Sequence, residues 1–341
     1  MKFIILLSTV CLASIGELVL ARHSNLHEWV QYKKVHGKVY EAPEEDSQRF
    51  SLFLAAKEQI RKHNAKPEAS YRLALNHLSD LTPEEAAKSK GFIYDPVKHM
   101  KRLGASKYDP FLQEILADPA PVPDEIDWRK VPGRVTTVKN QGGCASCWAF
   151  STTGLLEGQQ VVRNITKQLV SLSEQDLVDC SQSDYGCGGG DMDSALADIE
   201  KMGGIESEKD YPYKFGEARS LGDDECHFKK SKAVMTDSGS VDLPENDHDV
   251  IRATVAKYGP VAIALEANES FRAYSSGIFD DPKCGTALDH AVLIVGYGKC
   301  PKHGDYYIVK NSWGENWGER GYIRIKPGVC GVGSVAIISK F

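Results

Sequence analysis

The chain has 341 residues, of which 42% are hydrophobic and 26% charged, and its 41 basic and 47 acidic side chains give a formal charge of −6. This composition excludes a collagen, a disordered tail and a protein with several membrane spans, and it leaves a folded soluble protein of two or three units. The mildly acidic balance gives no reason to expect nucleic acid or an anionic membrane as the main partner. Nine cysteines, an odd number, predict a disulfide framework with a remainder if the compartment is oxidising.

The first residues have the pattern of a secretory signal. Lys2 precedes an apolar run over 3–13 that is too short to span a bilayer and is followed by small residues. Cleavage after Gly16 fits the small-x-small rule, and cleavage after Ala21 fits nearly as well. The alternative, a buried strand or helix, is uncommon directly behind a single lysine. We therefore expect Cys11 to be removed with the signal, and we expect a lysosomal or secreted protein without a membrane span.

The next hundred residues contain no cysteine and have the pattern of a helical unit. Apolar side chains recur at helical spacing over 44–64, while the basic side chains lie elsewhere on that helix. An earlier helix is also expected. The apolar face of the helix over 44–64 contains Phe50, Phe53, Leu54 and Ile60. The apolar face of the helix that precedes it in the chain contains Leu26, Trp29, Val30 and Tyr32.

The stretch 96–123 contains five prolines. Because proline lacks a backbone N–H and disfavours regular structure, we expect an extended linker here. A linker between a cysteine-free block and a cysteine-bearing block is a candidate processing site.

The remaining chain changes from helical to strand-like patterns. One helix is expected over 147–162, with Ser146 as its cap, and another from Ser173, where Ser173 and Asp176 resemble a capping box. Short apolar runs bounded by turn residues then predict strands. Helices followed by strands indicate an α+β protein with a helical and a mainly antiparallel subdomain. The expected strands are 261–265, 290–297, 306–310, 322–325 and 335–338.

Three residues with catalytic chemistry occur in the order Cys147, His290, Asn311. Cys147 stands at the expected start of a helix, where backbone N–H groups and the helix dipole lower the pKa of a thiol. A lone cysteine before tryptophan is more often a core or disulfide residue, and a lone histidine in an apolar strand is more often structural. A cysteine, a histidine and an asparagine in this order resemble the arrangement of papain-like cysteine proteases, and this resemblance favours the catalytic interpretation.

With these motifs, the sequence resembles the papain family of cysteine proteases and, within it, the cathepsin L-like branch, over nearly the whole chain after the signal. The cysteine lies in the run 140–150 (NQGGCASCWAF), the histidine in 288–292 (LDHAV) and the asparagine in 310–314 (KNSWG). The N-terminal block carries the family's propeptide signatures with departures at Ala56, Ala74 and Leu78. The matching signature residues are Glu45, Arg49, Phe53, Ile60, Asn64, Asn76 and Asp80.

The resemblance implies a papain-like two-lobed fold, with a helical L lobe and an antiparallel β-barrel-like R lobe, preceded by a helical inhibitory propeptide. It implies a cysteine endopeptidase made as a zymogen. Its partners would be protein and peptide substrates, its own propeptide and candidate cystatin-type inhibitors, with a monomeric state. The corresponding boundaries are 1–16 (or to 21) for the signal, 22–121 for the propeptide and 122–341 for the peptidase domain.

The resemblance also implies a role for each site residue. Cys147 would be the nucleophile, and His290 would form an ion pair with the thiolate and then protonate the leaving amine. Asn311 would orient the imidazole under the cover of Trp313. Gln141 and the backbone N–H of Cys147 would form the oxyanion hole.

The family pattern pairs six cysteines and leaves Cys147 and Cys300. Cys300 with His303 is a poor metal site, because two ligands in a lysine-rich loop are too few, so we expect no metal and no cofactor. The implied disulfides are Cys144 with Cys187, Cys180 with Cys226, and Cys284 with Cys330.

Substrate contacts follow from the same resemblance. Gly189 and Gly190 would hold an extended substrate backbone, because glycine permits close approach. Trp317 would form part of the primed side. A set of apolar residues would form the walls of the pocket for P2, the residue two places before the scissile bond, and the lack of an acid there predicts apolar P2 residues rather than arginine. This set contains Met192, Ala264, Leu288 and Val335.

Two departures concern specificity. Ala145 replaces a common glycine and adds a methyl group near the first unprimed subsite. Asp191 replaces an aromatic or aliphatic residue, so P3 is expected to tolerate or prefer a basic group, although a solvated loop carboxylate is an equally good interpretation. The stretch 214–225 lacks the cysteines and paired histidines of an occluding loop, which favours an endopeptidase.

Two sequons, at Asn164 and Asn268, are glycosylation candidates. The block 22–121 holds 16 basic and 14 acidic side chains, and the block 122–341 holds 24 and 32. We therefore expect weak attraction at neutral pH and, as a hypothesis, release of the propeptide on acidification. Two other functions stay open: an inactive binding protein of papain-like fold, and a free propeptide that inhibits related proteases.

Overall fold

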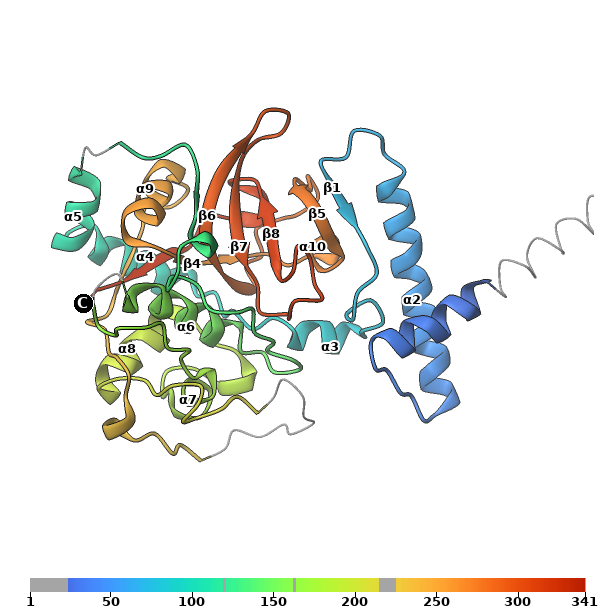
Figure 1. Ribbon diagram of the computed structural model, residues 1–341, viewed down its shortest axis with the longest axis horizontal. Helices are drawn as coiled ribbons and strands as arrows, with labels where there is room; N and C mark the ends of the chain where they lie inside the picture. Colours follow the sequence, from blue (N-terminus) through green and yellow to red (C-terminus); the bar gives the residue numbers. More distant parts are fainter. Residues whose placement is uncertain (1–23, 119–120, 162–163, 215–224, 341) are drawn as a thin grey trace, which may run out of the picture.

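The computed structural model describes residues 24–118, 121–161, 164–214 and 225–340. A twisted sheet occupies the middle of the molecule, three helices pack together below it in Figure 1, and the N-terminal segment (residues 24–118) extends across the whole assembly. The expected signal peptide and Cys11 lie outside the described residues. No helix among the described residues is long and apolar enough to cross a membrane.

The sheet has the strand order β1-β5-β8-β7-β6-β4-β9-β3, and β2 pairs with β6. All pairs are antiparallel except β5 with β8, which is parallel. The predicted strands are therefore present, and the N-terminal segment adds an unexpected edge strand, β1. The bounds are β1 Tyr71–Leu73, β2 Ile126–Asp127, β3 Ser240–Asp242, β4 Val261–Leu265, β5 Tyr274–Phe279, β6 His290–Cys300, β7 Gly304–Lys310, β8 Tyr322–Ile325 and β9 Ala336–Ser339.

The helix α6 (Cys147–Gln160) is the centre of the helical lobe, and all of its residues are buried. A helix that is covered on every side must lie in the interior, and α6 packs against β6 on one side and α8 on another. The surrounding helices are shorter. They are α7 (Glu174–Cys180), α8 (Met192–Met202), α9 (His248–Tyr258) and α10 (Glu269–Arg272), with 3₁₀ turns at Trp128–Lys130, Gly186–Gly188, Lys230–Lys232 and Val329–Gly331.

The N-terminal segment begins with a helix over 24–35 that crosses α2 (Pro43–Asn64). Trp29, Tyr32 and Phe53 form a small separate core between them. Leu26 and Val30, which we expected on the buried face, are exposed. The reason is that this two-helix unit buries only one narrow stripe of the first helix.

Polar contacts hold this unit together. Arg49 forms ion pairs with Glu45 and Glu85 and donates to the carbonyl of Asp80. The Asp80 carboxylate is fully buried and accepts a hydrogen bond from Tyr32 Oη at 2.9 Å. Asn64 exchanges two hydrogen bonds with the backbone of β1, at 2.8 and 3.0 Å. These signature residues therefore connect α2 to the following strand and loop.

The prediction of an extended linker over 96–123 is wrong for most of this stretch. The structure has α3 (Pro83–Lys88), then α4 (Pro96–Ser106) and α5 (Pro110–Ala117). The prolines stand in the first turn, where the missing N–H has no intrahelical role, and Asp95 and Asp109 cap the two helices. After α5, residues 121–123 are irregular and exposed.

Two expected helix caps are only partly present. The Ser146 side chain does not cap α6, because its hydroxyl is bonded to Tyr213 Oη at 2.8 Å instead. Ser173 Oγ does accept the backbone N–H of Asp176, but the backbone N–H of Ser173 donates to the carbonyl of Glu206 rather than to the Asp176 side chain. The capping box at α7 is therefore half formed.

The structure contains disulfides between Cys144 and Cys187, Cys180 and Cys226, and Cys284 and Cys330. These are the pairs that the resemblance implies. Among the described residues Cys147 and Cys300 are free. The first disulfide joins the loop before α6 to the Gly186–Gly188 turn, so it fixes the two walls around the start of α6.

Candidate active site

Strand register brings the three predicted catalytic residues together. His290 is the first residue of β6, and Asn311 directly follows β7, and these two strands pair antiparallel with Leu293 opposite Lys310. His290 Nε2 and Asn311 Oδ1 are 2.8 Å apart, and the amide oxygen can only accept, so Nε2 carries the proton. Cys147 begins α6, which packs on β6, and its Sγ accepts the backbone N–H of Ala291 at 3.3 Å.

The orientation of His290 leaves one ring nitrogen for proton exchange. Nδ1 is buried and has no hydrogen-bond partner among the described residues. Trp313 stacks on the imidazole, with ring centroids 4.7 Å apart and an interplanar angle of 24°. The indole therefore covers the ring whose Nε2 is bonded to Asn311, as the resemblance implies.

Complete burial keeps both reactive groups neutral in this structure. Cys147 and His290 have no exposed surface. Burial raises the pKa of the Cys147 thiol to about 12, although the N–H of Ala291 opposes the shift. Burial also lowers the pKa of His290 to about 3, although the hydrogen bond that its ring donates to Asn311 opposes the shift. The expected thiolate and imidazolium are thus disfavoured, because water is excluded and charged forms lose hydration.

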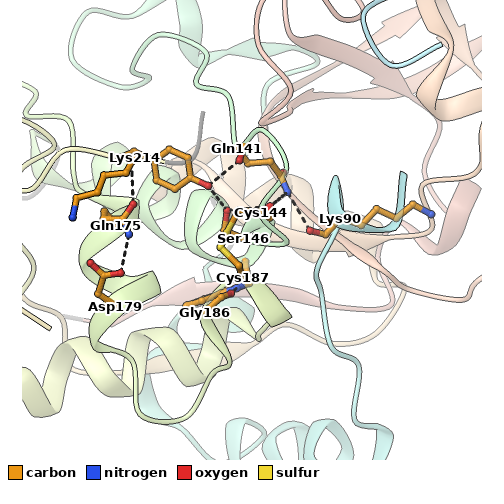
Figure 2. The surroundings of a disulfide bond; sticks show 11 residues. Lys90, Gln141, Cys144, Ser146, Gln175, Asp179, Gly186, Cys187 and Lys214 are labelled. Carbon is orange, nitrogen blue, oxygen red and sulfur yellow. Dashed lines mark hydrogen bonds between the residues drawn. A yellow bond between two sulfur atoms is a disulfide. The ribbon is translucent and has the colours of Figure 1, made fainter. Parts of the chain in front are cut away.

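The N-terminal segment causes this burial by lying across the site. The carbonyl of Lys90 accepts a hydrogen bond from Gln141 Nε2 at 3.1 Å, and Figure 2 shows this contact beside the Cys144–Cys187 disulfide. Gln141 Nε2 also donates to the carbonyl of Cys144, and Gln141 Oε1 accepts a hydrogen bond from Ser312 Oγ at 2.6 Å. Gln141 is therefore fixed with its N–H group aimed at the covering chain.

A short stretch of backbone fits closely into the site. The Gly190 N–H donates to the carbonyl of Gly91, and the N–H of Ile93 donates to the carbonyl of Gly190, both at 2.9 Å. A Cβ added to Gly91 would lie 2.0 Å from the carbonyl oxygen of Ala145, and Gly91 has a φ of +135°. Gly189 is also in a positive-φ conformation that favours glycine. Only glycine at residue 91 permits this close approach.

The predicted P2 residues lie in one apolar cluster. The N–H of Ala264 donates to the carbonyl of Val335, and Met192 and Leu288 belong to the same buried set. Phe92 from the N-terminal segment is buried in this cluster as well.

The ring of Trp317 packs against the rings of Phe271 and Trp313. Its Nε1 donates to the carbonyl of Arg272 at 3.0 Å, and Asn76 Nδ2 donates to that carbonyl at 2.8 Å. Asn76 of the propeptide signature therefore contacts the face on which we expected the primed subsites.

Sequence analysis missed the covering stretch 89–93 and one supporting cluster. Trp313 Nε1 donates to the carbonyl of Ser89 at 2.6 Å. Below Asn311, Lys310 Nζ donates to Thr136 Oγ1, and burial lowers the pKa of Lys310 to about 8. A lysine directly before the expected asparagine was visible in the sequence, but its burial was not. Gly91 was the only sequence sign of the covering stretch.

The two sequons differ in accessibility. Asn164 is exposed, with a positive φ of 54°. Asn268 is half-buried, its Oδ1 caps α10, and its Nδ2 donates to Asp281 at 3.0 Å. Both stay candidates, and Asn164 has the freer side chain.

Comparison with known proteins identifies both blocks. The papain family cysteine protease profile matches residues 122–339, and the cathepsin propeptide inhibitor domain (I29) profile matches residues 29–86. The chain belongs to the papain family of cysteine proteases. It is a zymogen of a papain-like cysteine endopeptidase, and its N-terminal segment contains the propeptide inhibitor domain.

Individual relatives resemble this protease over nearly their whole length. Cathepsin L1 of Drosophila melanogaster is 40% identical over 349 residues, covering 98% of this chain and 91% of the relative. Procathepsin L of Mus musculus is 37% identical, covering 98% of each. The structure of digestive procathepsin L 3 from the Tenebrio molitor larval midgut has a TM-score of 0.80 and 37% identity, covering 93% of this chain and 99% of that one.

The contact at Gly91 generates a prediction about the covered state. Gly91→Ala would place a methyl group against the backbone of Ala145, so the propeptide should seat poorly and the site should open. We expect labelling of the zymogen at pH 7.5 by a thiol-directed epoxide to be about tenfold faster or more. The measurement is the labelling rate by intact-mass spectrometry.

The matched control is Gly104→Ala, also in the propeptide. An added Cβ there meets no atom within 4 Å, and the φ of Gly104 is not positive. Its labelling rate should equal that of the unaltered zymogen. Equal rates for all three proteins would show that Gly91 does not hold the cover in place.

Proposed function

We propose that Cys147, His290, Asn311 and Gln141 carry out peptide-bond hydrolysis through an acyl-enzyme. The observation that supports this most strongly is the 2.8 Å contact between His290 and Asn311, next to the Cys147 sulfur at the start of α6. This is the geometry in which a second residue orients the base for a thiol nucleophile.

Once the propeptide has left, solvent returns to the site and the thiol can transfer its proton to His290 Nδ1. The thiolate attacks the substrate carbonyl carbon, and the oxyanion accepts hydrogen bonds from Gln141 Nε2 and the N–H of Cys147. His290 then gives its proton to the leaving amine, the C–N bond breaks, and a thioester remains on Cys147. Water, deprotonated by His290, hydrolyses the thioester and regenerates the thiol.

The propeptide acts as an internal inhibitor in this proposal. Its Lys90 carbonyl uses the Gln141 N–H group that would bind the oxyanion, and its backbone bonds use Gly190. We propose cleavage near 121–123, which gives the boundaries 22–121 and 122–341, after a signal that ends at residue 16 or 21. Residues 121–123 are exposed and irregular, which supports access by a protease.

Acid-promoted release is supported by histidines inside the propeptide. Burial lowers the pKa of His36 and His63, and burial together with the charge of Lys38 lowers that of His77 to about 4. The folded propeptide holds these rings neutral, whereas the unfolded segment protonates near pH 6.5. Stability present above pH 6.5 is therefore lost as pH falls from about 6.5 to about 4. This loss of stability adds to the loss of attraction that follows when carboxylates between the propeptide and the peptidase domain are protonated.

We further propose that the protease prefers apolar P2 residues and follows the secretory route to lysosomes or the exterior as a monomer. The burial of Phe92, Ala264 and Val335 in the same apolar core supports the first point. Three disulfides support the second, because such bonds persist in oxidising compartments. Cystatin-type inhibitors stay candidate partners.

The central test labels the protein with an epoxide thiol inhibitor before and after acid treatment. We expect acid-dependent labelling at Cys147, and Cys147→Ala should lose peptidase activity by about 1,000-fold or more because no other group replaces the nucleophile. Cys300→Ala, which removes the other free thiol, should retain full activity. Labelling that maps elsewhere, or activity that survives in Cys147→Ala, would contradict the assignment.

The P2 preference is tested with a peptide series that differs only at that position. Leu, Val or Phe should give a kcat/KM at least about tenfold above that of Arg, because the pocket residues are apolar and an unpaired guanidinium would lose hydration there. A higher kcat/KM for P2 Arg than for P2 Leu would overturn the preference.

The histidine account predicts that His77→Asn slows acid processing. Without this titrating ring, the propeptide should lose less stability at pH 5, and conversion to the mature size should be about three- to tenfold slower than in the unaltered zymogen. Conversion is followed by gel densitometry over time. His27→Asn, at an exposed propeptide histidine, is the control and should process normally. Equal rates for all three at pH 5 would exclude His77 as a pH sensor.

A further inference from the structure

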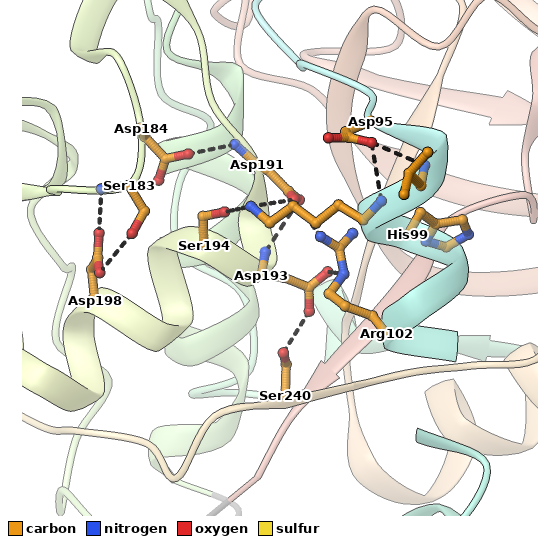
Figure 3. Close-up of polar contacts among 12 residues, drawn as sticks. Asp95, His99, Arg102, Ser183, Asp184, Asp191, Asp193, Ser194, Asp198 and Ser240 are labelled. Atoms are coloured by element: carbon orange, nitrogen blue, oxygen red, sulfur yellow. Dashed lines mark hydrogen bonds and ion pairs between the residues drawn. The ribbon is translucent and has the colours of Figure 1, made fainter. Parts of the chain in front are cut away.

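An arginine of the propeptide is bound in an acidic recess of the peptidase domain. Arg102 of α4 lies 2.6 Å (Nη1) from Asp191 Oδ2 and 2.8 Å (Nε) from Asp193 Oδ2. Its Nε is also 3.4 Å from Asp242 Oδ2. Figure 3 shows the guanidinium between α4 and the start of α8. The recess therefore already contains a cationic side chain.

The three carboxylates are buried. The side chains of Asp191, Asp193 and Asp242 are 9%, 5% and 2% exposed. Asp193 Oδ2 and Asp242 Oδ1 have no hydrogen bond among the described residues. Among the described residues, these two buried acceptor atoms are therefore contacted by Arg102 and His99 of the propeptide alone.

Among the described residues, the ion pairs of these three carboxylates all come from the N-terminal segment. Besides Arg102, Lys98 Nζ lies 3.7 Å from Asp191, and His99 Nδ1 lies 3.2 Å from Asp242. Within the peptidase domain the described contacts are neutral, such as the hydrogen bond from Ser240 Oγ to Asp193. Loss of the propeptide leaves three adjacent carboxylates without a counter-charge.

The recess adjoins the substrate path. Asp191 directly follows Gly190, whose N–H and carbonyl both bind the propeptide backbone at Gly91 and Ile93. Met192, which we assigned to the P2 pocket, directly follows Asp191. A substrate held by Gly190 with P2 in that pocket has its next residue, P3, beside Asp191.

We propose that in the mature protease the recess of Asp191, Asp193 and Asp242 is a subsite for a basic side chain, arginine above all, at P3 of the substrate. The guanidinium would take the place of Arg102. Its fork of donors can contact two carboxylates at once, as Arg102 does, whereas a lysine ammonium is a single point charge. This inference rests on the proposed peptidase function and specifies its substrate class.

The ion pairs of Asp191 in the zymogen support the subsite interpretation of this residue. A solvated loop carboxylate would be exposed and unpaired, but Asp191 is paired with Arg102 and Lys98. Its backbone N–H further donates to Asp184 Oδ1 at 2.8 Å, which fixes its position.

The test uses acid-matured protease and fluorogenic peptides acetyl-Xaa-Leu-Gln-aminomethylcoumarin, where Xaa at P3 is Arg, Lys, Leu or citrulline. Citrulline has the shape of arginine without its charge. We expect kcat/KM for P3 Arg to exceed that for citrulline by about tenfold at low ionic strength, and the ratio to shrink as salt is added.

Asp191→Asn should bring the Arg-to-citrulline ratio close to one, and measurable cleavage of the citrulline peptide shows that the variant is folded. Glu200→Gln, at an exposed carboxylate on the same helix, should keep the full ratio. If Asp191→Asn does not fold, the P3 subsite is tested by the salt dependence of the Arg-to-citrulline ratio in the unaltered protease.

A ratio within twofold at low salt, or a ratio that persists in Asp191→Asn, would overturn the P3 subsite while leaving the peptidase function intact. Failure of the unaltered mature protein to cleave any of the four peptides would instead overturn the proposed function, and the subsite with it.

Discussion

The exclusion of water from the Cys147 and His290 side chains is the interaction on which the zymogen depends. A cysteine peptidase needs a thiolate, and charged forms are stable only where water or fixed dipoles replace lost hydration. The covering stretch 89–93 removes the water and directs the carbonyl of Lys90 at Gln141. The same stretch therefore disfavours the reactive thiolate form of Cys147 and occupies the N–H group that would bind the oxyanion.

The rest of the fold keeps these groups in position. Antiparallel pairing of β6 and β7 sets His290 next to Asn311, and the packing of α6 on β6 brings Cys147 to the same end of the sheet. The propeptide is attached at both ends of this arrangement. At one end β1 extends the sheet at β5, and at the other end α4 inserts Arg102 beside Asp191. The covering stretch 89–93 lies between these two anchors and meets the site through the carbonyls of Ser89, Lys90 and Gly91.

The sequence predicted the parts of this structure that have a local signal. Alternating apolar runs bounded by turn residues identified β4 and β8 with their observed bounds, and the order of Cys147, His290 and Asn311 indicated the reaction. The proline stretch was misjudged because proline both breaks helices and begins them, and the capping residues Asp95 and Asp109 were the distinguishing signal. The burial of Lys310 and the pairing of Arg102 depend on residues far apart in the chain, so no local pattern reveals them.

The central claim is that the propeptide silences a complete site by keeping its thiol neutral. The most direct measurement is the pH dependence of iodoacetamide alkylation at Cys147, resolved by peptide mass spectrometry, in the zymogen and after propeptide removal. In the zymogen the rate should rise about tenfold per pH unit up to at least about pH 9 without a plateau, and in the mature protease it should be high and nearly flat from about pH 5 to 8. The same flat profile in both forms would contradict the account.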